Sequence, residues 1–168
     1  MNLELGPIVK MPLKDLVKSE INPRLWDYGP IEEMADTLDE TGQIEPLIVR
    51  KEGDKYGVLC GERRRKAGEN LEKVEIDCRV FEGTEAEAFA LIGIEDIHKE
   101  EFTPYERGKF YKEWREATGL TQDQLATTMG KSQPFVSHYE RLYQVLDPEV
   151  GENTVSYTHL TLPTNREV

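Results

Sequence analysis

The sequence predicts an α+β protein, in which a small α/β domain over residues 1–82 precedes an all-helical domain over residues 83–150. Runs rich in β-forming residues occur in the first half, whereas successive helix caps occur in the second. A helix-turn-helix is predicted at about residues 120–146, where a glycine separates two short amphipathic segments. Residues 151–168 show neither helical nor strand periodicity and resemble translated vector sequence, so no function is assigned to them.

The α/β domain is expected to contain two helices and three strands. Apolar residues recur at helical spacing from Ile31, between a proline and a glycine, which predicts a surface helix. The runs PLIVR (46–50) and YGVLCG (56–61) flank an EGD turn and predict a hairpin. The basic segment ERRRKAGENL follows as a second helix, and VEIDCRVF predicts a third strand. The residues of this strand expected to face inward are Val74, Ile76, Cys78 and Val80.

The helical domain is expected to contain four helices, three of which begin with a capping box. In such a box a Thr side chain caps the helix and a Glu or Gln three residues later bonds back to it. Gly119 and Gly130 are expected to end the second and third helices. Ser132 would cap the fourth, which reaches toward Leu146 and Pro148. The three boxes are Thr84 with Glu87, Thr103 with Glu106, and Thr121 with Gln124.

The net charge of −12 argues, taken alone, against a nucleic-acid partner, because phosphate binding needs clustered Lys and Arg. The acidic residues concentrate between Glu69 and Glu101, whereas the segment after Thr121 is close to neutral, so a local DNA-binding module is not excluded. No run of about 18 apolar residues and no signal peptide is present, which predicts a cytoplasmic protein without a membrane partner. Cys60 and Cys78 lack metal-binding spacing and are expected to be small core residues.

The segment LCGERRRKAG (59–68) predicts an anion-binding turn. A strand, a glycine and a helix start follow one another, and a helix N-terminus offers backbone N–H groups to an anion. Arginines in a first turn oppose the helix dipole by about 0.3–1 kcal/mol each unless an anion neutralises them. Arg63 and Arg64 are therefore expected to contact phosphate. The alternative is a solvated basic helix face.

The segment GIEDIHKEEFTPYE (93–106) crowds carboxylates near a predicted helix end. Carboxylates close to bound phosphates are the usual protein ligands of Mg²⁺, so Glu95 and Asp96 are candidate metal ligands. The alternative is a solvated acidic loop. His98 has no second His or Cys at ligand spacing, which makes a zinc site implausible.

The predicted helix-turn-helix would place the N-terminal residues of its second helix in the DNA major groove. A Gln there can read adenine through two hydrogen bonds, and a Ser can bond a base or a phosphate. Pro134 is tolerable because it falls in the first turn of that helix. An αα-hairpin used for packing or protein contact is the alternative. The expected DNA-contacting residues are Gln122, Lys131, Ser132, Gln133, Phe135, Ser137 and His138.

Five blocks in order resemble the ParB partition-protein family, which includes Noc and KorB-type plasmid proteins, and the resemblance covers about residues 8–150. The blocks are NPR (22–24), TGQIEPLIVR (41–50), CGERRRKAG (60–68), IEDIHKEEFTPYE (94–106) and the helix-turn-helix.

The resemblance implies a homodimer that loads through its helix-turn-helix at a palindromic centromere-like DNA site. It further implies that CTP with Mg²⁺ closes the dimer into a sliding clamp, that slow CTP hydrolysis resets it with Glu95 as a catalytic residue, and that a ParA-type ATPase is a partner. Such a protein would be nucleoid- or plasmid-associated. The nucleotide-binding residues implied are Arg24, Gly61, Glu62, Arg63, Arg64, Glu95 and Asp96.

Two departures from the family pattern bear on the nucleotide function. The family usually has Glu-Asn followed by Arg where this chain has Glu95-Asp96 and then His98-Lys99, and it has Gln where this chain has Glu45. These departures keep open a transcriptional regulator without a nucleotide switch. A ParB-like nuclease or phosphoryl-transfer enzyme is a further alternative, against which the helix-turn-helix argues.

Overall fold

The computed structural model describes residues 3–25, 30–99 and 102–146. The strands are β1 Leu5–Pro12, β2 Leu16–Lys18, β3 Leu47–Glu52, β4 Lys55–Cys60 and β5 Glu75–Phe81, with a 3₁₀ turn at Leu13–Asp15. The helices are α1 Ile31–Thr41, α2 Glu62–Asn70, α3 Glu85–Lys99, α4 Pro104–Thr118, α5 Gln122–Met129 and α6 Gln133–Val145. None of these helices is long and apolar enough to cross a bilayer.

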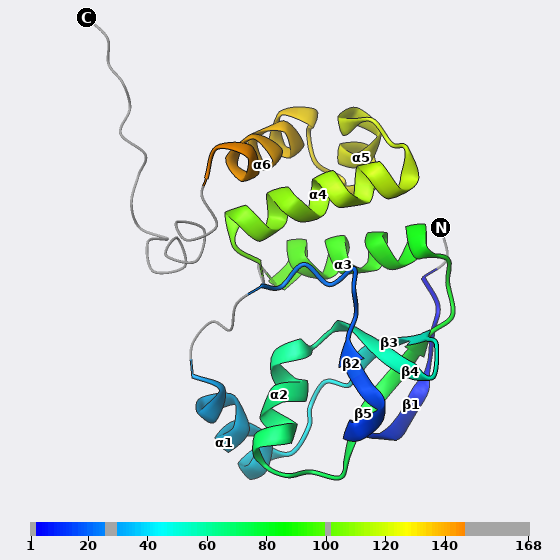
Figure 1. Ribbon diagram of the computed structural model, residues 1–168, viewed down its shortest axis with the longest axis vertical. Coiled ribbons are helices and arrows are strands. Elements are labelled where there is room, and N and C mark those ends of the chain that lie inside the picture. The colour runs from blue at the N-terminus through cyan, green and yellow to red at the C-terminus, as the bar shows by residue number, and fades with distance from the viewer. Residues whose placement is uncertain (1–2, 26–29, 100–101, 147–168) are drawn as a thin grey trace, which may run out of the picture.

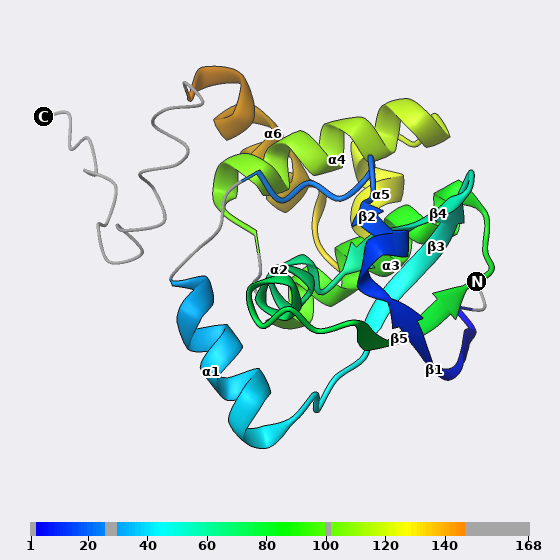
Figure 2. The same ribbon diagram turned by 60° about the horizontal axis from the view of Figure 1, so that its bottom comes forward.

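The strands form one mixed five-stranded sheet in the order β1-β5-β3-β4-β2. The β3–β4 hairpin is antiparallel, β3 pairs with β5 in parallel, and β1 and β2 occupy the two edges. Helix α2 provides the crossover between β4 and β5, with α1 packed beside it (Figure 2). A Cβ on Gly68 of α2 would lie 3.3 Å from Leu13 and 3.4 Å from Ile76, so this glycine permits close packing of helix on sheet.

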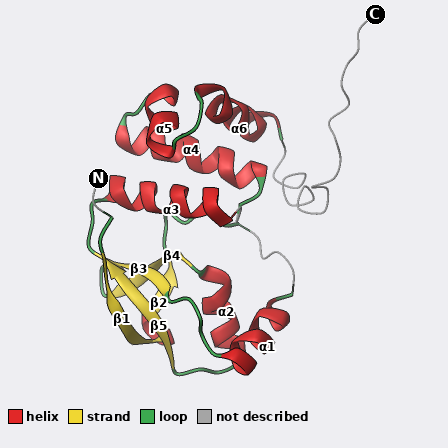
Figure 3. Cartoon of the chain, turned by 180° about the vertical axis from the view of Figure 1, so that it is seen from behind, coloured by secondary structure: helices red, strands yellow, loops and turns green. Residues whose placement is uncertain are grey.

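Helix α3 separates the sheet from the other helices of the second half (Figures 1 and 3). One apolar cluster unites sheet residues such as Leu59 and Phe81 with Phe89 of α3 and Trp114 of α4, and it extends to Leu125 and Val136 in the last two helices. Trp114 is 1% exposed, and its ring stacks on that of Phe89 with centroids 6.4 Å apart. The helix-turn-helix is therefore built onto the same core as one face of the sheet.

The predicted α+β class is confirmed, and the three predicted capping boxes form. The sequence patterns do not predict β1 and β2, because β1 contains Pro7 and Pro12, which only an edge strand tolerates well, and β2 has three residues.

Three finer sequence predictions need correction, and two others fall outside the described residues. Val74 is 79% exposed, because it lies in the bend before β5, and Phe81 is buried instead. Ser132 occupies the N-cap position of α6, but within the described residues its hydroxyl makes no capping hydrogen bond. Cys60 is only half-buried. The expected stop at Pro148 and the tail over residues 151–168 lie outside the described part of the chain.

Candidate functional site

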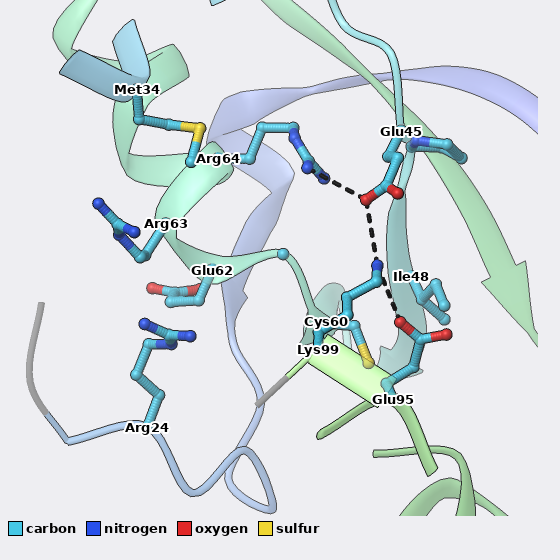
Figure 4. Close-up of a pocket in the computed structure, with 12 residues that line it drawn as sticks. Arg24, Met34, Glu45, Ile48, Cys60, Glu62, Arg63, Arg64, Glu95 and Lys99 are labelled. Atoms are coloured by element: carbon cyan, nitrogen blue, oxygen red, sulfur yellow. Dashed lines mark hydrogen bonds and ion pairs between the residues drawn. The ribbon is translucent and has the colours of Figure 1, made fainter. Parts of the chain in front are cut away.

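A pocket of about 280 Å³ opens where α1, α2, α3 and the sheet meet (Figure 4). Four cationic and three acidic side chains line this pocket, so the lining has a slight excess of positive charge in a chain of net charge −12. The local charge is therefore more favourable to an anionic ligand than the charge of the whole chain. The lining residues are Arg24, Met34, Glu45, Pro46, Ile48, Cys60, Gly61, Glu62, Arg63, Arg64, Glu95 and Lys99.

The turn from β4 into α2 forms the floor of the pocket. Gly61 is the N-cap of α2 and has a φ of 99° and a ψ of 24°, the left-handed region that favours glycine. A Cβ there would also lie 2.5 Å from Cδ2 of Leu47, so no other residue fits without displacement. The first N–H groups of a helix have no intrahelical acceptor. Gly61 thus brings these donors to the pocket, as the sequence predicts for an anion-binding turn.

Arg24 reaches the pocket from the segment after β2 because Asn22 fixes the backbone there. The Asn22 Nδ2 donates to the carbonyl oxygens of Val58 and Leu59, at 3.1 Å each, and its Oδ1 accepts from the Arg24 N–H at 3.0 Å. Asn22 is 6% exposed, so these bonds are shielded from water. The NPR block therefore attaches this segment to β4 and positions Arg24 beside Arg63 and Glu62 (Figure 4).

The basic residues of α2 divide into two groups. Arg65 donates from Nε and Nη2 to the two carboxylate oxygens of Glu62, at 3.0 and 2.6 Å, and from Nη1 to Glu69 at 2.5 Å. The hydrogen bonds and charge of Glu62 outweigh burial and raise the pKa of Arg65. Arg65 therefore holds the helix start in place, while Arg63 and Arg64 line the pocket.

Helix α3 contributes Glu95 and Lys99, which lie one turn apart on the same face. The Lys99 Nζ lies 3.0 Å from Oε2 of Glu95 and 3.1 Å from Oε2 of Glu45, and the same Glu45 oxygen lies 3.4 Å from Nη2 of Arg64 (Figure 4). Burial lowers the pKa of Lys99, but its two carboxylate partners more than compensate and raise it. Lys99 and Cys60 lie in the sequence blocks singled out above but were not predicted to line the site, and neither was Met34.

Asp96 lies outside the pocket, although it follows Glu95 directly. Successive helical residues point about 100° apart, so Asp96 faces α4. Its carboxylate is 1% exposed and accepts from the Phe102 N–H at 2.9 Å and from Arg107 Nε and Nη2 at 2.6 and 3.1 Å. Arg107 Nη1 also donates to the Tyr139 hydroxyl of α6 at 3.2 Å. Asp96 therefore joins α3 to α4 and α6, and its geometry does not suit the metal-ligand role suggested by the sequence.

The described residues contain no group of three or more His, Cys, Asp or Glu side chains placed to hold a metal ion. Glu95 is the carboxylate on the α3 side of the pocket, with its side chain 28% exposed. Mg²⁺ bound with a nucleotide commonly uses one or two protein carboxylates together with phosphate oxygens and water. Glu95 alone is therefore compatible with such a metal.

The helix-turn-helix is held by a polar network at its base. Gln133 at the start of α6 donates from Nε2 to Oε1 of Gln122 at the start of α5, at 2.7 Å. Gln122 in turn donates from Nε2 to Glu140 Oε2 at 2.7 Å, and Arg115 Nη1 lies 2.9 and 2.8 Å from the two Glu140 oxygens. Gly130, with a φ of 66°, makes the turn between the two helices. This network fixes the angle at which α6 presents its N-terminus.

The predicted DNA-contacting residues gather around the start of α6. Lys131, Ser132 and His138 are exposed, whereas Gln133 and Ser137 are half-exposed. Phe135 differs, because its ring packs edge-on to the ring of Tyr139, with the two ring centroids 4.9 Å apart, and packs against the main core. The arrangement leaves a polar helix start available to a groove and uses Phe135 mainly to support it.

Two family models match different parts of the chain. Residues 2–97 match the family model of the ParB N-terminal domain, and residues 112–151 match a helix-turn-helix model. The chain is 33% identical over 142 residues to the nucleoid occlusion protein of Lysinibacillus sphaericus, and the match covers 83% of this chain and 48% of that protein. The chain spans about half the length of the curated relatives it matches.

Two solved structures of the C-terminally truncated chromosome-partitioning protein ParB from Caulobacter crescentus are similar, each at 26% identity. The complex with CTP-γ-S has a TM-score of 0.52, and the match covers 90% of this chain and 86% of that chain. The complex with the centromeric parS site has a TM-score of 0.55, with coverage of 88% and 78%.

Proposed function

Because this chain belongs to the ParB N-terminal domain family, we propose that it is a sequence-specific DNA-binding partition protein whose α/β domain binds CTP. The observation that carries the nucleotide part is the convergence of Arg24, Arg63, Arg64 and Lys99 on a pocket at the N-terminus of α2. Backbone donors, a positive helix end and arginine side chains in one place suit a triphosphate. A Caulobacter crescentus relative crystallised with a CTP analogue supports the choice of nucleotide.

In this proposal the turn at Gly61 receives the phosphates, with Glu62 behind it holding Arg65, and Arg63 and Arg64 contact phosphate oxygens. A bound Mg²⁺ would supply charge neutralisation between phosphates. Glu95 would hold that metal or orient a water for slow hydrolysis, and its presence in the pocket lining supports this role. Asp96 takes no part, since Arg107 and the Phe102 N–H occupy its oxygens.

The helix-turn-helix would load the protein at a palindromic centromere-like site. The exposed start of α6 offers Lys131 and Ser132 to phosphate and Gln133, Ser137 and His138 to base edges. A palindromic site implies a homodimer, and the family implies that CTP closes it into a sliding clamp and that a ParA-type ATPase is a partner. These roles place the protein on a nucleoid or plasmid.

The decisive experiment is equilibrium titration of the 168-residue chain with CTP, ATP, GTP and UTP in the presence of Mg²⁺. We expect selective CTP binding that Arg64→Ala reduces by about tenfold or more, because charge-assisted hydrogen bonds are the strong contacts of such a site. The same variant should retain binding to a duplex carrying the centromeric parS site, which serves as the control for folding. Absence of binding by any nucleotide would refute the switch, and loss of both activities in Arg64→Ala would indicate misfolding.

A transcriptional regulator without a nucleotide switch is the second candidate. The observation that favours it is the Glu45 carboxylate, which already contacts two of the four pocket cations. In that case the chain would bind its DNA site, and CTP would change neither the affinity nor the lifetime of the complex on closed circular DNA.

A further inference from the structure

Glu45 lies where a ligand phosphate would be expected. Its Oε2 is 3.4 Å from Arg64 Nη2 and 3.1 Å from Lys99 Nζ, so one carboxylate oxygen bridges two cations from two different helices (Figure 4). A phosphate oxygen in a triphosphate site makes contacts of the same kind. The carboxylate and a phosphate therefore require the same donors.

The backbone holds Glu45 at this place. Gln43 donates from Nε2 to the carbonyl oxygens of Glu45 and Asp77, at 3.0 and 2.7 Å, and its Oε1 accepts from the Asp77 N–H at 2.7 Å. Gln43 thus ties the loop before β3 to β5. Pro46 follows directly and restricts the Glu45 backbone to extended conformations. The carboxylate consequently enters the pocket from a fixed anchor, whereas its 51% exposed side chain retains room to swing into solvent.

The charge state of Glu45 strengthens the competition. The hydrogen bond and charge of Lys99, followed by those of Arg64, lower the pKa of Glu45 below its ordinary value. The carboxylate is therefore ionised throughout the neutral range, and it repels an incoming triphosphate in addition to occupying its donors.

We propose that Glu45 is a built-in competitor of the nucleotide phosphates, which must displace it from Arg64 and Lys99 before they can bind. This inference rests on the proposed nucleotide function and adds a residue that sets its affinity. Exposed ion pairs are individually weak, so the displacement lowers affinity without abolishing binding. A chain with a neutral side chain at this position would bind more tightly and would need less nucleotide to switch.

The test is to compare the native chain with Glu45→Gln and with Glu40→Gln, titrating each with CTP and with inorganic triphosphate in the presence of Mg²⁺. Gln keeps the size and the hydrogen-bonding oxygen of Glu45 and removes its charge. Glu40 is an exposed carboxylate of α1 that does not line the pocket, so its variant matches the change in net charge. We expect Glu45→Gln to bind both ligands about tenfold more tightly and Glu40→Gln to resemble the native chain.

The two ligands separate this inference from the function on which it rests. If inorganic triphosphate binds Glu45→Gln more tightly than the native chain while CTP binds none of the proteins, Glu45 competes with phosphate as proposed and the proposed nucleotide is wrong. If CTP binds the native chain and Glu45→Gln equally well, the competitor is overturned and the nucleotide function stands. Failure of inorganic triphosphate to bind Glu45→Gln more tightly than the native chain likewise overturns the competitor.

Discussion

Removing Arg107 should destabilise the protein far more than removing Lys112, a partly exposed lysine of the same helix. Arg107 makes two hydrogen bonds to Asp96, at 2.6 and 3.1 Å, and one to the Tyr139 hydroxyl at 3.2 Å. Burial lowers the pKa of Arg107, but the hydrogen bonds and charge of Asp96 outweigh the effect of burial. The pKa of Arg107 is therefore raised above the ordinary arginine value. The guanidinium is therefore a permanent cation in the interior.

The expected magnitude follows from burial. The side chains of Arg107 and Asp96 are 12% and 1% exposed, so Arg107→Ala would leave the Asp96 carboxylate almost without solvent and without its counter-charge. Breaking a buried ion pair in this way costs about 3–5 kcal/mol. For a chain of this size the midpoint of thermal unfolding should fall by about 6–20 °C.

The assay is urea and thermal unfolding followed by far-UV circular dichroism. Lys112→Ala is the matched control, because Lys112 lies on the same helix and its Nζ is 3.8 Å from Glu116 in an exposed pair. Lys112→Ala should lower the free energy of unfolding by less than about 1 kcal/mol. A double variant, Asp96→Asn with Arg107→Leu, should be more stable than Arg107→Ala, because it leaves no uncompensated charge. A loss in Arg107→Ala no larger than in Lys112→Ala would refute this reasoning.

Two further predictions concern recognition and thiol chemistry. Gln133→Ala should weaken binding to the specific DNA site by about 1–3 kcal/mol and leave non-specific binding nearly unchanged. Competition against a scrambled duplex would measure both affinities. An equal loss of affinity on both duplexes would contradict base reading by Gln133. At pH 8 iodoacetamide should modify Cys60 before Cys78. Burial, followed by the charge of Asp77, raises the pKa of the Cys78 thiol to about 12. Peptide mapping of the native protein after modification would measure the order. Modification of Cys78 at an equal rate would show that this strand opens readily.

Local signals in the sequence predict most of the helices correctly. Thr103 with Glu106 and Thr121 with Gln124 form reciprocal capping boxes, because such bonds depend only on residues three apart. The Gly61 turn was likewise predictable from a strand, a glycine and a helix start. These features are determined by neighbouring residues and hence leave a readable pattern.

Long-range features were less predictable. Nothing near Asp96 in the sequence indicates that Arg107 and the Phe102 N–H occupy its carboxylate, whereas the neighbouring Glu95 lines the pocket. The contacts of Glu45 depend on Lys99, 54 residues away, and on the loop geometry before β3. Such contacts arise only once the elements have packed, so composition and spacing do not specify them.

The edge position of β1 has a consequence for the order of events during biosynthesis. Its partner is β5, and the pair Lys10–Asp77 spans 67 residues, whereas the β3–β4 hairpin closes across a two-residue turn. Non-local pairings form slowly, because the intervening chain must first lose its freedom. Of the five strands of this sheet, β1 is synthesised first and is therefore among the last to be paired. Its backbone remains exposed to neighbouring nascent chains until residue 81 has emerged.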